Sequence, residues 1–252
     1  MKKKFNLMII KKTAMNVYIK LKQRTFITTE GRKLKYLFFR GDFKQSKLLV
    51  VFSAYPARHQ KAVYNYVKTL KNSKANRLFI LDDFGYEGVG SFYLGDKCQL
   101  YKEQAIEQLI TFITNKYHIT ERWFVGSSKG GVASLIYGFR MNVDRLVIGS
   151  PAFRLGQTFL VNSYRKDILS AIIDIDESSI EWIDTLIERT IADSEKKTKV
   201  ELVYSDREEP WADVSKLVQY LREQKIECEL HNEYYTDHNE IGRVFSKYIS
   251  QL

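Results

Sequence analysis

One stretch near the middle of the chain restricts the possible folds more than any other. Residues 123–140 read Trp-Phe-Val-Gly-Ser-Ser-Lys-Gly-Gly-Val-Ala-Ser-Leu-Ile-Tyr-Gly-Phe-Arg: a short apolar run, a glycine-flanked serine, then a helical pattern. Within it, Gly126–Gly130 fits G-x-S-x-G at a sharp turn from a strand into a helix. Such a turn exposes the hydroxyl of its central residue, Ser128, at a helix N-terminus where free N–H groups favour negative charge. The stretch therefore predicts a nucleophilic serine above a sheet.

Apolar runs and helical patterns alternate along most of the 252 residues. The predicted strands are Leu48–Phe52, Leu78–Leu81, Arg122–Val125, Arg145–Ile148, Val200–Tyr204 and Ile226–Leu230, and an edge hairpin joins Thr25–Thr29 to Tyr36–Arg40. The predicted helices are Gln60–Leu70, Tyr101–Lys116, one from Gly130 onwards, Asp213–Gln224 and Ile241–Ile249. This alternation predicts one α/β domain with a mostly parallel sheet and helices on both faces. Residues 152–197 break the rhythm and are predicted to be helical.

The chain is basic, with a formal net charge of +10. Lysine and arginine are densest at Lys2–Lys4, Lys11–Lys12 and Lys20–Arg40. The simplest interpretation is a solvated basic surface. The alternative is attraction to an anionic partner: nucleic acid, the inner leaflet of a membrane, or a phosphate-bearing glycan precursor. No nucleic-acid motif supports the first of these, so we expect no nucleic-acid partner.

Cysteine and histidine usage argues against disulfide and metal chemistry. The two cysteines, Cys98 and Cys228, lack C-x-x-C spacing, and no His/Cys cluster has the spacing of zinc ligands. The apolar run Phe5–Ile10 is too short for a signal peptide, and no later stretch approaches transmembrane length. We therefore expect a cytoplasmic protein without a metal, either free or peripheral to the inner face of the membrane.

A nucleophilic serine needs a base, and His238 is the best candidate. It lies in the polar loop Tyr235–Asn239 between the last predicted strand and the last predicted helix, which can reach the serine from the carboxyl edge of the sheet. The other histidines, His59, His118 and His231, are interpreted as structural.

The orienting acid is expected after the strand Val200–Tyr204, in the segment Ser205-Asp206-Arg207-Glu208-Glu209-Pro210. Asp206 comes directly off the strand and is favoured, while Glu208 remains the alternative because loop lengths vary at this position. Either choice gives the chain order serine, acid, histidine that is expected in this topology.

The oxyanion hole requires two backbone N–H donors. One should be that of Lys129, directly after the nucleophile, and the other should come from the loop Ser53–Pro56, where Ala54 or Tyr55 is the candidate. A lysine at a helix N-terminus is mildly unfavourable. Its side chain is expected either to face solvent or to meet an anionic group on the substrate.

These residues together resemble the α/β-hydrolase fold over nearly the whole chain, with 152–197 in the position of the cap insertion. The segment Asp82–Ser91 resembles the D-x-x-G-x-G-x-S loop that many hydrolases carry after the fourth strand. Two departures are visible: Ser53-Ala54 replaces the usual His-Gly of the oxyanion loop, and the acid is not in a standard Gly-x-x-Asp turn. Backbone N–H groups can form an oxyanion hole without the His-Gly pair, and both Asp206 and Glu208 remain candidates for the acid.

A finer likeness rests on Gly126–Gly131 and on Gly90–Gly95. These stretches are similar to the XcbB/CpsF capsular polysaccharide family and to the hydrolase-like glycan-modifying proteins of bacterial accessory Sec systems. The resemblance implies a cytoplasmic protein that acts on glycan or glycoprotein precursors, with protein partners in a surface-glycan system.

The favoured function is a serine-dependent acyl ester hydrolase, an esterase or deacetylase that needs no cofactor. One alternative is an O-acyltransferase that passes the acyl group to a sugar hydroxyl, and another is a non-catalytic scaffold on the same fold. Aromatic residues near such a site more often belong to the core than to a pocket. The candidates for lining an acyl or sugar pocket are nevertheless Ser53, Tyr86, Phe92, Tyr93, Phe153 and Phe159.

Overall fold

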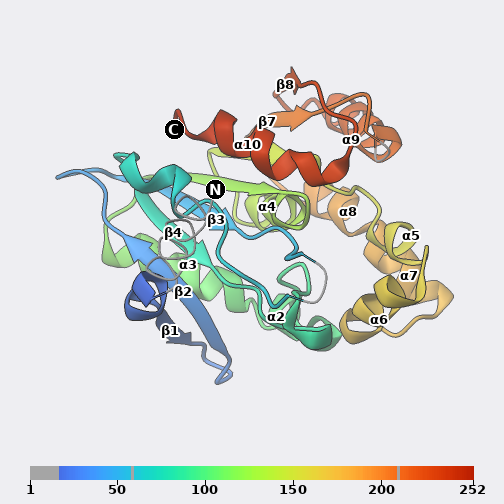
Figure 1. The fold of residues 1–252 in the computed structure, drawn as a ribbon, viewed down its shortest axis with the longest axis horizontal. Helices are drawn as coiled ribbons and strands as arrows, with labels where there is room; N and C mark the ends of the chain where they lie inside the picture. The colour runs from blue at the N-terminus through green and yellow to red at the C-terminus, as the bar shows by residue number, and fades with distance from the viewer. Residues whose placement is uncertain (1–16, 58–59, 209–210) are drawn as a thin grey trace, which may run out of the picture.

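The computed structural model describes residues 17–57, 60–208 and 211–252. Its centre is an eight-stranded sheet in the order β1-β2-β4-β3-β5-β6-β7-β8 (Figure 1). The strands are β1 (Arg24–Ile27), β2 (Lys33–Phe39), β3 (Lys47–Phe52), β4 (Asn76–Ile80), β5 (Glu121–Ser127), β6 (Arg145–Gly149), β7 (Lys199–Tyr204) and β8 (Cys228–Asn232). From β4 to β8 along the sheet every pair is parallel, whereas β1 and β2 form the predicted antiparallel hairpin at one edge. The predicted α/β class and mostly parallel sheet are therefore confirmed.

Helices cover both faces of the sheet. They are α2 (Gln99–Lys102), α3 (Ala105–Lys116), α4 (Lys129–Arg140), α5 (Leu155–Phe159), α6 (Ser163–Ile172), α7 (Glu177–Asp184), α8 (Leu186–Ala192), α9 (Trp211–Glu223) and α10 (Ile241–Ile249), with the short 3-10 helices η1 (Thr69–Asn72), η2 (Tyr86–Gly88), η3 (Asp96–Cys98) and η4 (His238–Glu240). Among the described residues, no helix has the length and apolar character needed to cross a membrane.

The alternation of side chains along each strand divides the core in two. In β3, Leu48, Val50 and Phe52 belong to the larger core, which also contains residues of α3, α4 and α9, while Leu49 and Val51 point to the opposite face and belong to a second core that contains residues of α10. Both sets are almost completely buried, which explains why the central strands are continuous apolar runs rather than alternating ones. This double cover fixes the parallel strands rigidly, so that the loops at their carboxyl ends are well placed to carry a site.

The segment between β6 and β7 is helical, as predicted for 152–197. Its helices α5, α6 and α7 gather at one end of the molecule, while α8 packs beside α4 (Figure 1). Ile183, Leu186 and Ile187 are buried there and join the larger core.

The helix predicted over Gln60–Leu70 is wrong. Residues 60–68 have no regular secondary structure, and only the single turn η1 follows. The apolar spacing at Val63, Tyr66 and Leu70 suggested a stripe, yet Val63 is half exposed and Tyr66 has a left-handed backbone with φ 61°. Polar contacts made by this segment, described below, replace the helix hydrogen bonds.

Candidate active site

Ser128 occupies the turn between β5 and α4. Its backbone has φ 50° and ψ −118°, a conformation that non-glycine residues rarely adopt and that is typical of a strained nucleophile turn. The N–H of Ser128 donates to the carbonyl of Gly149 at 2.7 Å, which anchors the turn to the neighbouring strand β6. The predicted strand, turn and helix are therefore present, and they place Ser128 at the carboxyl edge of the sheet.

Helix α4 starts so close to strand β3 that position 130 has room only for glycine. A Cβ atom on Gly130 would lie 2.4 Å from the carbonyl oxygen of Phe52, which is backbone and cannot yield cheaply. We expect Gly130→Ala to lower the free energy of unfolding by about 3 kcal/mol or more, since overpacking against a fixed partner forces the backbone to shift.

The matched control for this prediction is Gly242→Ala, in helix α10. A Cβ atom there meets nothing within 4 Å, so alanine should stabilise the helix by about 0.5–1 kcal/mol. Chemical denaturation of both variants checks the prediction, and equal stability of the two proteins would contradict it.

His238 lies beside Ser128, where the sequence predicted it. Its Nε2 is 2.9 Å from the Ser128 Oγ, although the two residues are 110 positions apart in the sequence. The histidine begins η4 after the loop that leaves β8, and the Asp237 carboxylate accepts from the Asn239 N–H at 2.9 Å to fix that turn. The imidazole is 36% exposed, so a substrate can reach it.

The acid in contact with the imidazole is Glu208, not the favoured Asp206. Glu208 Oε2 lies 3.2 Å from His238 Nδ1, and the Glu208 side chain is completely buried. Asp206 is exposed, and its N–H donates to the Asn232 Oδ1 at 3.3 Å. The chain turns through Asp206 and Arg207 before it points back towards the sheet, so the residue that reaches His238 comes two positions later.

Two further residues, not predicted from the sequence, hold Glu208. The Ser150 hydroxyl donates to Glu208 Oε1, and the Tyr235 hydroxyl lies 3.3 Å from the same oxygen and 2.6 Å from the Ser150 Oγ. Burial raises the pKa of Tyr235 above its usual value, so the hydroxyl stays protonated and can donate. Both residues could have been found from their places in the chain. Ser150 directly follows β6, which is next to β7 in the sheet, and Tyr235 precedes His238 in the same loop.

The N–H groups of the loop after β3 differ in whether they already donate a hydrogen bond. The Ser53 N–H donates to the Tyr93 hydroxyl at 2.6 Å, and the Ala54 N–H donates to the Asn65 Oδ1 at 3.0 Å. Within the described ranges, the N–H groups of Tyr55 and Lys129 donate to no protein acceptor. Of the two candidates in this loop, the geometry therefore favours the N–H of Tyr55 over that of Ala54 as the partner of Lys129.

The segment mistaken for a helix brings two more residues to the site. Besides the contact of Asn65 with Ala54, the Tyr66 hydroxyl lies 2.5 Å from the Oγ of Ser127, the neighbour of the nucleophile. Burial raises the pKa of Tyr66 to about 12. Nothing in the sequence indicated these contacts, because the apolar spacing of this segment predicted a helix.

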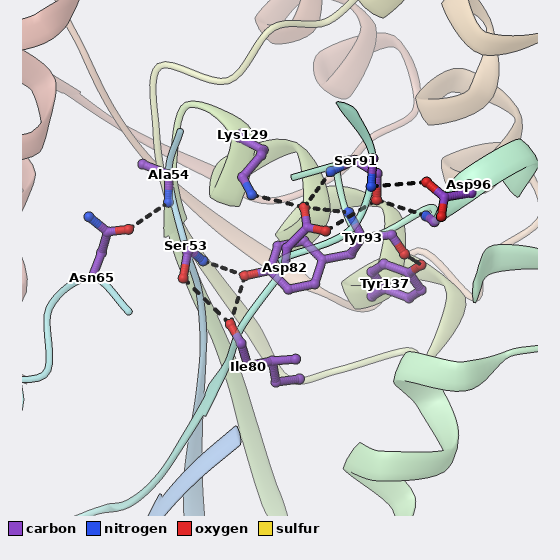
Figure 2. A network of polar contacts seen from close by, with 12 residues as sticks. Ser53, Ala54, Asn65, Ile80, Asp82, Ser91, Tyr93, Asp96, Lys129 and Tyr137 are labelled. Atoms are coloured by element: carbon purple, nitrogen blue, oxygen red, sulfur yellow. Dashed lines mark hydrogen bonds and ion pairs between the residues drawn. The ribbon is translucent and has the colours of Figure 1, made fainter. Parts of the chain in front are cut away.

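The side chain of Lys129 neither faces solvent nor waits for a substrate, contrary to both expectations. It is buried, and its Nζ forms an ion pair with the Asp82 Oδ2 at 2.8 Å (Figure 2). Burial lowers the pKa of Lys129, and the neighbouring Asp82 carboxylate opposes that shift. The pairing joins the nucleophile turn to the end of β4.

All but one of the residues predicted to line a pocket are buried. Ser53 and Tyr93 are buried and hydrogen-bonded to each other, so they support the loop after β3 rather than line a pocket. Phe92 packs edge to face against the rings of Tyr55 and Phe159 at centroid distances of 5.4 and 5.2 Å, and Phe153 is also buried. These aromatic residues lie in the core between the sheet and the helical segment.

Tyr86 is the remaining pocket candidate and the most open of the predicted set. Its half-buried ring meets Tyr164 of α6 at a centroid distance of 6.0 Å. Its side chain is therefore the most accessible of these candidates.

The remaining histidines lie away from this site or outside the described residues. His231 is in β8 and contacts the Tyr248 hydroxyl at 2.8 Å, and His118 follows α3 at the surface, while His59 falls outside the described residues. In the described part of the chain, no group of three or more His, Cys, Asp or Glu side chains is arranged to hold a metal ion.

No protein-family model and no curated protein sequence matches the chain. Solved structures do. The capsule O-acetyltransferase of Neisseria meningitidis serogroup A matches with a TM-score of 0.73 and 20% identity, over 90% of this chain and 98% of that one. The glycosylation-associated protein complex Gap123 from Streptococcus agalactiae matches with a TM-score of 0.71 and 22% identity, over 91% of this chain and 46% of that one.

A third similar structure is the fluorophosphonate-binding serine hydrolase FphF of Staphylococcus aureus. It has a TM-score of 0.64 and 10% identity, over 91% of this chain and 96% of that one. At such low identities the likenesses establish the fold alone. The chain has the α/β-hydrolase fold, as its sequence motifs indicated.

Proposed function

We propose that this chain is a serine-dependent O-acyltransferase that acts through an acyl-enzyme on the hydroxyl groups of surface-glycan or glycoprotein precursors. The observation that carries the proposal is the contact series from Ser128 Oγ to His238 Nε2 at 2.9 Å and from His238 Nδ1 to the buried Glu208 at 3.2 Å. A scaffold without turnover has no need for a buried carboxylate aligned with a half-exposed imidazole.

The first half-reaction follows from this alignment. With its own proton on Nδ1 facing Glu208, the imidazole accepts the Ser128 proton at Nε2 while the Ser128 Oγ attacks the carbonyl carbon of an ester or thioester. The N–H groups of Lys129 and Tyr55 would donate to the oxyanion. When the intermediate collapses, His238 returns the proton to the departing alcohol or thiol, and the acyl group remains on Ser128.

The second half-reaction decides between transfer and hydrolysis. His238 removes a proton from a sugar hydroxyl as that oxygen attacks the acyl-Ser128 carbonyl, and the collapse returns the proton to Ser128. If water attacks instead, the same residues perform hydrolysis. The likeness to a capsule O-acetyltransferase, of which a mutant has been solved in complex with CoA, supports transfer, whereas the likeness to FphF supports hydrolysis as the runner-up.

An anionic donor such as a CoA thioester is compatible with the residues near the site. The exposed Arg207 directly precedes Glu208 in the chain, and its guanidinium lies 4.6 Å from the Tyr234 ring centroid. Burial raises the pKa of Tyr55, and Arg165 of α6, whose guanidinium donates to the Thr158 carbonyl at 3.2 Å, opposes that shift. Neither arginine has a carboxylate partner in the described part of the chain, so both are available to phosphate groups.

The choice between transfer and hydrolysis is tested with acetyl-CoA as donor and methyl glycosides of hexoses and N-acetylhexosamines as acceptors. We expect at least one acceptor to raise the rate of thiol release by about tenfold and to gain the acetyl group, since a bound hydroxyl has a high effective concentration. Thiol release and product mass are measured together, with Ser128→Ala as the blank. Steady thiol release that no acceptor changes would favour the hydrolase instead.

A further inference from the structure

A buried cation directly follows the nucleophile, and its presence needs an explanation. The side chains of Lys129 and Asp82 have no exposed surface. Burying both charges carries a desolvation cost that the ion pair rarely recovers, so an apolar pair of the same size would serve stability as well or better. Stability alone therefore does not account for this pair.

The Lys129 ammonium lies between two aromatic rings of other segments. Its Nζ is 5.2 Å from the ring centroid of Tyr55 and 5.2 Å from that of Tyr93, within the range of cation–π attraction. Tyr55 and Lys129 carry the two N–H groups of the candidate oxyanion hole that have no acceptor among the described residues. One side chain thus connects the two segments that supply these donors.

The Asp82 carboxylate extends the connection into the loop after β4. It accepts from the Ser91 N–H at 2.8 Å, the Ser91 hydroxyl at 3.1 Å and the Tyr93 N–H at 3.1 Å, in addition to Lys129 (Figure 2). With all four donors in place, the carboxylate has a fixed orientation, and Lys129 is held against it.

Tyr93 links the Asp82 carboxylate to the loop after β3, which contains Tyr55. Its hydroxyl donates to the carbonyl of Ile80 at 2.9 Å and accepts from the Ser53 N–H at 2.6 Å (Figure 2). Ser53 is two residues before Tyr55. The contacts therefore form a closed path from Lys129 through Asp82, Tyr93 and Ser53 to Tyr55, whose ring lies beside the lysine again.

The Lys129 ammonium lies against the backbone of Gly90, where any side chain would occupy its place. A Cβ atom on Gly90, which has φ +112°, would lie 2.1 Å from the Lys129 Nζ and 2.8 Å from the Asp82 Oδ2. A glycine at this position is thus required by the pair as well as by the turn.

We propose that Lys129 is a positioning residue: through Asp82 and the rings of Tyr55 and Tyr93, its side chain sets the spacing of the two N–H groups that receive the oxyanion. The proposal rests on the proposed acyl-transfer function. Donors to an oxyanion must lie within about 2.7–3.1 Å of the developing charge, and a misplacement of about 1 Å costs on the order of 100-fold in rate.

The first test is Lys129→Met, which removes the ammonium and keeps an unbranched side chain of similar length. We expect kcat for p-nitrophenyl acetate to fall roughly 10- to 100-fold per folded molecule, with KM changed less than about threefold, because the loss falls on the transition state rather than on ground-state binding.

The matched control is Arg140→Met at the other end of α4. Arg140 pairs with Glu107 at 2.8 Å, and their side chains are 21% and 13% exposed, so this variant also breaks a largely buried ion pair. It should lower stability while leaving kcat per folded molecule unchanged. Equal kcat values for the two variants, corrected for the folded fraction, would overturn the proposal.

A milder pair guards against a Lys129 variant that does not fold. Tyr93→Phe removes only the hydroxyl that bonds Ser53 and Ile80, while Tyr220→Phe removes a hydroxyl that bonds the Glu188 carbonyl at 3.0 Å in another part of the molecule. We expect the first to lower kcat severalfold and the second to leave it unchanged, and equal values would count against the proposal.

Amide hydrogen exchange over residues 53–57 separates this inference from the proposed function. Lys129→Met should accelerate exchange in that loop, and Arg140→Met should not. Unchanged loop exchange in Lys129→Met would overturn the positioning role whether or not the wild-type protein transfers acyl groups. A loosened loop in a protein whose wild type has no turnover supports the positioning and overturns the acyl-transfer function alone.

Discussion

Replacement of Ser128 by alanine is expected to abolish both fluorophosphonate labelling and turnover of acyl donors. The Ser128 Oγ is the atom that His238 Nε2 meets at 2.9 Å, and no acyl-enzyme can form without it. Loss of a catalytic serine costs on the order of 10⁶-fold in kcat in enzymes of this type. The fold should be unaffected, because Ser128 contributes its backbone rather than its side chain to the turn.

His238→Ala should show nearly the same loss, since serine and base act as a unit and their effects do not add. His118→Asn is the matched control: His118 is exposed after α3, and asparagine tolerates its left-handed backbone with φ 53°. Labelling is measured with a fluorophosphonate probe and turnover with p-nitrophenyl acetate. Turnover retained in Ser128→Ala, with His238→Ala as active as His118→Asn, would refute the assignment.

Glu208→Gln is expected to have the second largest effect, a loss of roughly 10³- to 10⁴-fold in kcat. An amide in place of the carboxylate removes the negative charge opposite the imidazolium and disturbs the tautomer that places the free nitrogen at Ser128. Asp206→Asn should change kcat less than about threefold, because Asp206 is exposed and does not contact His238. The steady-state rates of the two variants, measured side by side, decide between the two acids.

The stability of Glu208→Gln must be measured with its activity, because the side chain is completely buried and accepts from Ser150. A folded Glu208→Gln protein with nearly wild-type kcat, or a large loss in Asp206→Asn, would overturn the assignment of the acid.

The sheet and the strand–turn–helix unit that carries Ser128 could be predicted because their signals are local. The apolar run before Gly126 and the helical pattern after Gly130 lie within one short segment, and the turn between them has few alternatives. His238 was found by topology, because the loop after the last strand opens at the same edge as Ser128. In each case the neighbours in sequence carry most of the information.

The acid and the lysine partner depend on contacts that sequence neighbours do not determine. Asp206 and Glu208 belong to one loop, and the path of that loop decides which carboxylate turns inward. Asp82 lies 47 residues before Lys129, and only the parallel placement of β4 and β5 on either side of β3 brings the two charges together. Nothing near Lys129 in the sequence indicates that its ammonium is buried.

The helix predicted over residues 60–70 is wrong for a different reason. Its apolar residues recur at helical spacing, but Asn65 and Tyr66 bond Ala54 and Ser127, and the backbone must leave helical geometry at Tyr66 to make those contacts. Here tertiary contacts at the site override local propensity. A segment whose predicted helix is absent because its residues make such contacts can therefore point to the site.

The most direct measurement is the acyl-enzyme itself. Wild-type protein is mixed with acetyl-CoA or p-nitrophenyl acetate, quenched in acid within milliseconds, digested and mapped by mass spectrometry. We expect one acetyl group on the peptide that contains Ser128, absent from Ser128→Ala and removed when an acceptor glycoside is added before the quench. Turnover by a wild-type protein in which the Ser128 peptide never carries the acyl group would contradict it.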